Sequence, residues 1–302
     1  MIFSPYLKAG DTIGIVAPAR KVCREELSFA IRWWEEKGFR IVLGEHLFSE
    51  NNQYAGTDRE RTEDLQNMMN NSDINAIFCA RGGYGTMRII DSLNFTNFVL
   101  QPKWICGFSD ITALHSHINT IYKVATIHAA MPISMQENRL QNLETLYNTL
   151  TGEALVYTCE PHLLNRTGYC KGELIGGNLS LLYALSNSVS DINTTNKILF
   201  IEDTDEYLYH IDRMMLHLKR AGKLRDLAGL LVGSFTKIKD HEIAFGSTVE
   251  QIIREHCATY SFPVAFNFPA GHDDINLTLK FGANYSLSVQ DIGTVFQEEY
   301  CF

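Results

Sequence analysis

Short apolar runs alternate with amphipathic segments through the first half of the chain. A continuous apolar run of about four to eight residues is typical of a buried strand, whereas apolar residues three and four apart indicate one face of a helix. Leu27, Ile31 and Trp34 have the helical spacing, and Gly38 follows them as a helix stop. The predicted strands are 12–17, 39–43, 76–80 and 104–108, and the predicted helices are 25–37, 57–70, a segment from about 86, and 112–122.

This alternation predicts βαβ units, and therefore an α/β fold with a parallel sheet and helices on both faces. The pattern changes after about residue 150. We expect an N-terminal α/β domain over 1–150, an irregular connector over 151–166 and a second α/β domain over 167–302. In the second domain we expect a glycine-rich turn at Gly172, Gly176 and Gly177, a helix from Leu179, strands at 197–201 and 227–235, and a helix at 207–221.

Composition narrows the class of protein. The 302 residues include 26 Lys and Arg against 35 Asp and Glu, for a formal net charge of −9 without a basic stripe, so neither nucleic acid nor an anionic membrane is an expected partner. No apolar run approaches the roughly 18 residues of a spanning helix, and residues 1–10 do not resemble a secretory signal. The seven scattered cysteines suit reduced thiols. We expect a soluble cytoplasmic protein without a metal or other cofactor.

Ser109 is the first candidate for chemistry, because it follows the predicted strand 104–108 and precedes a predicted helix. Open parallel sheets bind ligands at the carboxyl ends of their strands, and the N–H groups that begin a helix can stabilise an oxyanion. Gly107 lies two residues before Ser109, as in the nucleophile turn of α/β-hydrolases, but Ile111 replaces the second glycine of that motif. The pattern predicts either a nucleophile or an ordinary helix cap.

The glycine-rich turn 81–85 is the second candidate, and it also joins a strand to a helix. Glycines let the backbone approach a ligand closely and leave N–H groups pointing toward it. The turn lacks the Lys-Ser/Thr end of a P-loop, and no Gly-x-Gly-x-x-Gly follows the first strand, so a nucleotide site is not expected. An oxyanion hole and a plain tight turn are equally compatible with the pattern.

A nucleophilic serine needs a base, and the base needs an orienting carboxylate. His115 and His117 lie two apart on one predicted helix and cannot both face one site. His128 could approach the sheet edge as a rival base or a substrate contact, whereas His272 lies in a polar loop typical of a catalytic histidine. Among the carboxylates of 202–206, Glu202 directly follows a strand and is the least expected to be free in solvent.

Taken together, these segments resemble the LD-carboxypeptidase family of serine peptidases, which includes muramoyltetrapeptide carboxypeptidases and microcin C immunity proteins. The chain departs from the family pattern at Ala129 and Lys280, where a glycine and a proline are usual. The matching segments run in family order: 10–19 (GDTIGIVAPA), 80–85 (ARGGYG), 107–112 (GFSDIT), 172–179 (GELIGGNL), 201–203 (IED), 211–213 (IDR) and 270–272 (AGH).

The resemblance implies a Ser-Glu-His triad: Ser109 as nucleophile, His272 as general base and acid, and Glu202 as the group that orients the imidazole. The oxyanion hole would then use the N–H of Asp110 and one from the glycine turn. We favour Gly83 over Gly82 for the second donor. Arg81 and His128 are candidate substrate contacts.

The resemblance also implies a flavodoxin-like or class I amidotransferase-like N-terminal domain and a smaller, swivelling C-terminal domain, with the active site between them and a homodimer as the usual assembly. The implied reaction removes the terminal D-alanine from murein tetrapeptide during cytoplasmic peptidoglycan recycling. Three alternatives remain: an immunity-type hydrolase of aminoacyl or peptidyl nucleotides, a thiol enzyme that uses Cys79 or Cys106, and a non-catalytic small-molecule binding module.

Overall fold

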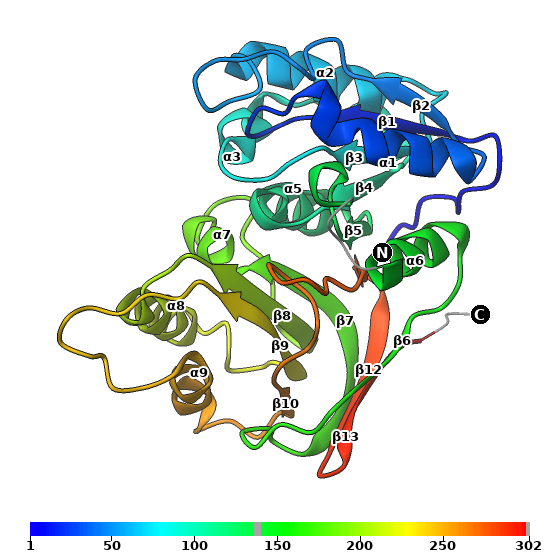
Figure 1. Ribbon diagram of the computed structural model, residues 1–302. Helices are drawn as coiled ribbons and strands as arrows, with labels where there is room; N and C mark the ends of the chain where they lie inside the picture. The colour runs from blue at the N-terminus through cyan, green and yellow to red at the C-terminus, as the bar shows by residue number, and fades with distance from the viewer. Residues whose placement is uncertain (136–139, 300–302) are drawn as a thin grey trace. The chain divides into compact units, whose positions relative to one another are not determined.

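The computed structural model describes residues 1–135 and 140–299, and the chain divides into two compact units (Figure 1). The first unit contains Met1–Glu153 and Leu277–Phe281, and the second contains Ala154–Asn276 and the chain from Gly282 onward. The expected second domain, 167–302, therefore includes a short segment, Leu277–Phe281, that in the structure belongs to the first unit. Leu279 and Phe281 are buried there as part of an antiparallel edge strand. Such a short segment carries too little periodicity to indicate which sheet it joins.

The first unit is built on a doubly wound sheet. Its strands are β1 (Thr12–Val16), β2 (Arg40–Leu43), β3 (Ala76–Cys79), β4 (Trp104–Gly107), β5 (Thr126–His128) and β11 (Leu279–Phe281). Their order is β11-β5-β4-β3-β1-β2, and all neighbours are parallel except β11 with β5. The parallel part, β2-β1-β3-β4-β5, has the strand order of flavodoxin-like folds. The prediction of a parallel-sheet N-terminal domain is confirmed.

The helices of this unit are α1 (Arg24–Glu36), α2 (Asp58–Asn70), α3 (Thr86–Ile89), α4 (Thr96–Leu100), α5 (Thr112–His117) and α6 (Leu140–Thr151). Four of them, α1, α2, α3 and α5, begin close to the predicted positions, whereas α4 and α6 were not predicted. Thr57 caps α2, because its hydroxyl accepts from the Glu60 N–H at 3.2 Å while the Glu60 carboxylate accepts from the Thr57 N–H at 2.7 Å. The predicted helix 112–122 changes to a π-helical turn at Ile118–Tyr122.

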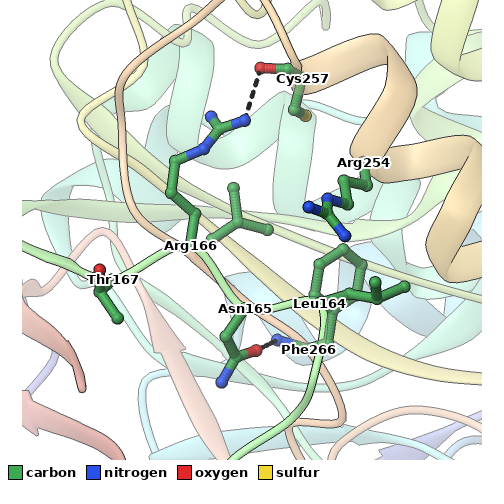
Figure 2. A pocket seen from close by; sticks show the side chains of 8 residues that line it. Leu164, Asn165, Arg166, Thr167, Arg254, Cys257 and Phe266 are labelled. Carbon is green, nitrogen blue, oxygen red and sulfur yellow. Dashed lines mark hydrogen bonds between the residues drawn. The ribbon is translucent and has the colours of Figure 1, made fainter. Parts of the chain in front are cut away.

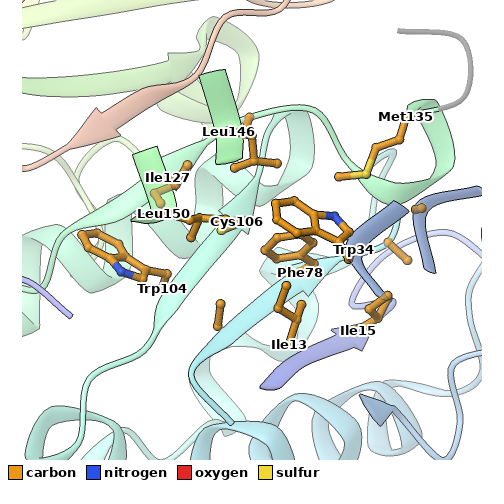
Figure 3. Packing of buried hydrophobic residues seen from close by; sticks show 14 of the residues in the cluster. Ile13, Ile15, Trp34, Phe78, Trp104, Cys106, Ile127, Met135, Leu146 and Leu150 are labelled. Atoms are coloured by element: carbon orange, nitrogen blue, oxygen red, sulfur yellow. The ribbon is translucent and has the colours of Figure 1, made fainter. Parts of the chain in front are cut away.

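Trp34 lies at the centre of the core on one face of this sheet. Its side chain is fully buried, and its ring meets Phe78 edge-on at 5.1 Å between centroids. Figure 3 shows it above Ile13 and Ile15 of β1, with Leu146 of α6 on the same face. α1 and α6 therefore cover this face through a continuous apolar layer.

The second unit is also α/β, with one half of its sheet antiparallel. Its strands are β6 (Val156–Cys159), β7 (Gly168–Asn178), β8 (Lys197–Thr204), β9 (Gly229–Thr236), β10 (Val264–Ala265), β12 (Asn284–Gln290) and β13 (Gly293–Glu298), in the order β10-β9-β8-β7-β12-β13-β6. β7 to β10 are parallel, and β12, β13 and β6 continue the sheet antiparallel from β7. Its helices are α7 (Leu179–Ala184), α8 (Leu208–Arg220) and α9 (Val249–Cys257). The prediction of a second α/β domain is confirmed.

The predicted turn at Gly172, Gly176 and Gly177 is wrong, because all three glycines lie inside β7. A Cβ added at Gly176 would stand 1.9 Å from the carbonyl oxygen of Phe200 on β8. At Gly172 it would stand 3.0 Å from the carbonyl oxygen of Asn196. These glycines permit close approach of neighbouring backbone, a use that sequence alone does not distinguish from turn formation.

In the part of the chain that the structure describes, every helix is too short or too polar to cross a bilayer.

Replacing Trp34 by alanine should destabilise the first unit by about 3–5 kcal/mol, because it leaves a large cavity in a close-packed core. Trp33 is the matched control, since it neighbours Trp34 on α1 but is only half-buried. Urea unfolding followed by far-UV circular dichroism measures both variants. Equal losses from Trp34→Ala and Trp33→Ala would contradict the assignment of Trp34 to the centre of the core.

Candidate active site

Ser109 lies in a strained turn at the carboxyl end of β4. Its φ is +63°, a left-handed conformation that a serine rarely adopts. Such a residue costs of order 1–3 kcal/mol and persists only where the surrounding structure imposes it. The chain continues as a short 3₁₀ turn, Ser109–Ile111, and then as α5. The structure therefore places a partly exposed hydroxyl at a sharp strand-to-helix turn, as a nucleophile requires.

The glycine-rich turn after β3 lies directly against Ser109. A Cβ added at Gly82 would stand 3.1 Å from the Ser109 Cβ and 3.3 Å from its Oγ. Gly83 has a φ of +108°, and a Cβ there would stand 2.5 Å from the Arg20 Cδ. The absence of a side chain at Gly82 therefore lets its backbone lie close to the serine, and the absence of one at Gly83 makes room for Arg20.

Two buried polar side chains hold the glycine turn. The Asp110 carboxylate accepts from the Thr86 N–H at 2.8 Å, which ties the residue after Ser109 to the start of α3. Burial raises the pKa of Asp110. From the other side, Arg61 donates to the carbonyl oxygen of Gly85 at 2.9 Å and also to that of Pro18. These contacts fix the two strand-end turns relative to each other.

The second unit supplies an imidazole–carboxylate pair. Glu202 lies near the end of β8, is fully buried, and accepts a hydrogen bond from His272 Nδ1 at 2.6 Å. Gly271 makes the contact possible: its φ is +121°, and a Cβ there would stand 2.9 Å from Glu202 Oε2 and 2.5 Å from Ser234 Oγ. The Thr236 hydroxyl donates to the His272 carbonyl oxygen at 2.8 Å. The loop is thus held at the ends of β8 and β9 with a defined imidazole orientation.

The charge of Glu202 controls the protonation of His272. Burial alone favours the neutral imidazole, but attraction to the Glu202 carboxylate and the hydrogen bond between them outweigh it, and the pKa of His272 is raised. The exposed fraction of the His272 side chain is 20%, against 0% for Glu202. The arrangement is that of a general base whose tautomer is set by a buried carboxylate.

Asp203 is a second buried carboxylate beside Glu202, and the sequence pattern did not single it out. It accepts hydrogen bonds from Asn178 Nδ2 at 2.9 Å and from the Ser180 hydroxyl at 2.7 Å, which anchor the start of α7. Burial and the charge of Glu202 raise the pKa of Asp203 to about 6. Asp203 therefore binds the start of α7, whereas its neighbour Glu202 binds the His272 loop.

Arg81 and His128 have different surroundings. Arg81 is half-buried and donates to the Lys21 carbonyl oxygen at 3.2 Å. His128 is fully buried, with its ring 5.6 Å from that of Phe108 and 5.7 Å from that of Phe281 between centroids. Arg81 is thus near the surface, whereas His128 packs beneath the Ser109 turn.

The two departures from the family pattern lie in the first unit. Ala129 is buried and donates its N–H to the Gly107 carbonyl oxygen at 3.2 Å. Lys280 is also buried, and its ammonium lies 3.3 Å from the Tyr6 hydroxyl and 6.0 Å from the centroid of the Trp104 ring. Aromatic faces attract cations, so this ring helps to stabilise the buried ammonium.

The structure brings the sequence-predicted residues together within each unit. Ser109, Asp110 and the glycine turn are neighbours in the first unit, and Glu202 and His272 are hydrogen-bonded in the second. Within residues 1–135 and 140–299, no three His, Cys, Asp or Glu side chains form a group that could hold a metal ion.

Family models match most of the chain. The LD-carboxypeptidase N-terminal domain matches residues 13–129, and the LD-carboxypeptidase C-terminal domain matches residues 171–287. A Bacillus subtilis protein named "Probable murein peptide carboxypeptidase" is 34% identical over 298 residues, with 96% of this chain and 93% of that protein covered. The "Murein tetrapeptide carboxypeptidase" of Pseudomonas aeruginosa is 30% identical over 281 residues, with 89% and 91% covered.

More distant relatives share the fold. The crystal structure of muramoyltetrapeptide carboxypeptidase from Oxalobacter formigenes superposes with a TM-score of 0.88 at 23% identity, covering 96% of this chain and all of that one. The microcin C7 self-immunity protein MccF of Escherichia coli is 25% identical, with 97% of this chain and 95% of that protein covered.

Replacing Glu202 by glutamine should lower the pKa of His272 below its ordinary value. The attraction that raises the pKa is then removed, while the burial that lowers it remains. NMR titration of the histidine ring protons measures the shift, with the His272 signal assigned by its loss in His272→Gln. Glu242→Gln, at an exposed position of the same unit, should leave the titration unchanged. An unaltered His272 titration in Glu202→Gln would contradict the pairing.

Proposed function

Because the chain belongs to the LD-carboxypeptidase family of serine peptidases, we propose that it hydrolyses the bond between an L-residue and a C-terminal D-residue, with murein tetrapeptide as substrate and D-alanine as a product. The names of the relatives from Bacillus subtilis and Pseudomonas aeruginosa support this substrate. The observation that carries the proposed mechanism is the hydrogen bond between His272 Nδ1 and the fully buried Glu202. It sets the orientation of the imidazole, with Nδ1 toward the carboxylate and Nε2 on the other side of the ring.

In the proposed reaction, Ser109 Oγ attacks the carbonyl carbon of the L-residue while His272 Nε2 takes its proton. The imidazolium, stabilised by Glu202, then protonates the departing amine of D-alanine. A water molecule, deprotonated by His272, hydrolyses the acyl-enzyme and restores the serine. The mechanism requires His272 Nε2 to come within hydrogen-bonding reach of Ser109 Oγ.

The proposed oxyanion hole consists of the backbone N–H of Asp110 and that of Gly83. The backbone of Gly82 lies against Ser109 and Gly83 is the next residue of the same turn, which supports a second donor from this turn. The Thr86 and Arg61 contacts hold the turn in place before substrate binds. One donor of this kind is worth about 3–4 kcal/mol of transition-state stabilisation.

The substrate carboxylate requires a cationic partner, for which we propose Arg81. A single hydrogen bond, to Lys21, engages its guanidinium among the described residues, so further N–H groups can meet a carboxylate. His128 is proposed to influence the substrate through Phe108, on which its buried ring packs.

The alternative thiol nucleophiles fit the structure poorly. Cys79 and Cys106 are fully buried in β3 and β4, and burial raises the pKa of both thiols. A thiolate is the reactive form of cysteine, so these residues lack the activation that a nucleophile needs.

The immunity-type alternative rests on the likeness to MccF. The greater identity to the two murein peptide carboxypeptidases favours the peptide substrate. A cytoplasmic location, a role in peptidoglycan recycling and a homodimeric assembly remain predictions.

Ser109→Ala should lower D-alanine release from murein tetrapeptide by at least about 10⁴-fold, because it removes the nucleophile. Mass spectrometry of the products measures the rate. Ser92→Ala, an exposed serine of the same unit, is the matched control and should keep full activity. Equal release by wild type and Ser109→Ala would contradict the serine mechanism. Turnover of aspartyl sulfamoyl adenosine without tetrapeptide cleavage would favour the immunity-type reaction.

The pH dependence of kcat/KM should show an acidic limb set by His272. Activity falls as pH decreases through the pKa of His272, because a protonated imidazole cannot accept the Ser109 proton. Since that pKa is raised, the midpoint should lie above the ordinary value of about 6.5. Glu202→Gln should move the midpoint to lower pH and reduce kcat by on the order of 10⁴-fold. A midpoint unchanged by Glu202→Gln would argue against His272 as the base.

A further inference from the structure

A pocket in the first unit lies at the end of the sheet opposite Ser109. Its volume is about 340 Å³. Asn75, which lines it, immediately precedes β3, and Lys103, which also lines it, immediately precedes β4. Ser109 follows the other end of β4, a strand of 4 residues, so roughly 13 Å of extended chain separates the two positions. The pocket is therefore distinct from the candidate active site.

Lys103 is the unusual residue of this pocket. Only 3% of its surface is exposed, and in the part of the chain that the structure describes its ammonium has neither an ion pair nor a hydrogen bond. Burial lowers the pKa of Lys103, and the charge of Asp73 opposes that shift without forming a contact. A cation withdrawn from water is unfavourable unless an anion or hydrogen-bond acceptors accompany it.

Other shielded lysines of the protein have partners. Lys197 pairs with Glu173 at 2.5 Å, and Lys223 pairs with Asp191 at 2.8 Å, although both are more exposed than Lys103. In both cases a carboxylate compensates for the partial burial of the ammonium. Lys103 differs from them in having no acidic partner among the described residues, so its ammonium can bind an anion that enters the pocket.

A second pocket, of about 250 Å³, lies in the second unit and is lined by two arginines (Figure 2). Unlike Lys103, neither arginine is both buried and without a partner among the described residues. There Arg166 donates to the carbonyl oxygens of Tyr260 at 2.7 Å and Cys257 at 3.1 Å, so its guanidinium already caps the end of α9. Arg254, which lines the same pocket, is exposed to solvent. Neither arginine requires a ligand.

We propose that the Lys103 pocket binds a small monocarboxylate. The single ammonium matches a single negative charge, and Asn75 adds a donor: its Oδ1 accepts from the Thr12 N–H at 2.9 Å, which leaves its Nδ2 group for the anion. The remaining wall is largely apolar and suits a short alkyl chain. The apolar lining residues are Pro5, Ile74, Leu100 and Pro102. The proposal is independent of the hydrolytic activity, because it uses none of the residues of the active site.

Trp104 provides a direct reporter of binding. Its indole N–H donates to the carbonyl oxygen of Pro5 at 3.0 Å, and Pro5 lines the pocket. The chain has 3 tryptophans, so protein labelled with ¹⁵N-tryptophan gives three indole signals, and Trp104→Phe assigns the reporter. Titration with sodium butyrate should shift the Trp104 signal saturably. Butyramide has the same shape without the charge and should bind at least about tenfold more weakly.

The lysine is tested by a matched pair of variants. Lys103→Met should weaken butyrate binding by about tenfold or more, whereas Lys8→Met, an exposed lysine of the same unit, should leave it unchanged. The proposal fails if butyramide binds wild type as well as butyrate does, or if Lys103→Met retains the affinity. Saturation by inorganic phosphate but not by butyrate would likewise overturn it. The comparison of butyrate with butyramide uses wild-type protein, so it tests whether binding requires the negative charge even if Lys103→Met does not fold.

Discussion

The buried hydrogen bond between Glu202 and His272 is the contact on which the chemistry of the second unit depends. A carboxylate with no exposed surface is unfavourable by itself, and the imidazole at 2.6 Å supplies the donor that makes its burial tolerable. In return, the carboxylate raises the pKa of His272 and fixes which ring nitrogen faces outward. Gly271 and Thr236 hold the loop so that this contact forms. The contact with Glu202 therefore both orients the His272 imidazole and raises its pKa.

In the first unit, the turn that contains the strained Ser109 is held beside the glycine-rich turn. The left-handed φ of Ser109 is tolerated because the next residue, Asp110, is tied to Thr86 at the start of α3. Arg61 binds the same turn from the opposite side, through Gly85. Neither contact was identified from sequence, because in each a side chain, that of Asp110 or Arg61, binds backbone that is distant along the chain.

The sequence predicted those features of the site that leave a local signature. Ser109 stands between a predicted strand and a predicted helix, and Glu202 follows an apolar run, so topology alone placed both at strand ends. Asp203 and Lys103 carried no such signal. A carboxylate next to another and a lysine before a strand are ordinary surface patterns, and only burial distinguishes these two residues.

The hydrophobic periodicity by itself determined the alternation of strands and helices, because strand and helix periods are local properties of side-chain pattern. It could not determine that Leu279–Phe281 pairs with β5, or that Gly176 lies in β7 rather than in a turn. The tertiary structure decided those points, since strand pairing and close backbone approach depend on residues far apart in the chain. The pairing of His272 with Glu202 is a further example. Its loop is local, but the carboxylate that raises its pKa is 70 positions away in sequence.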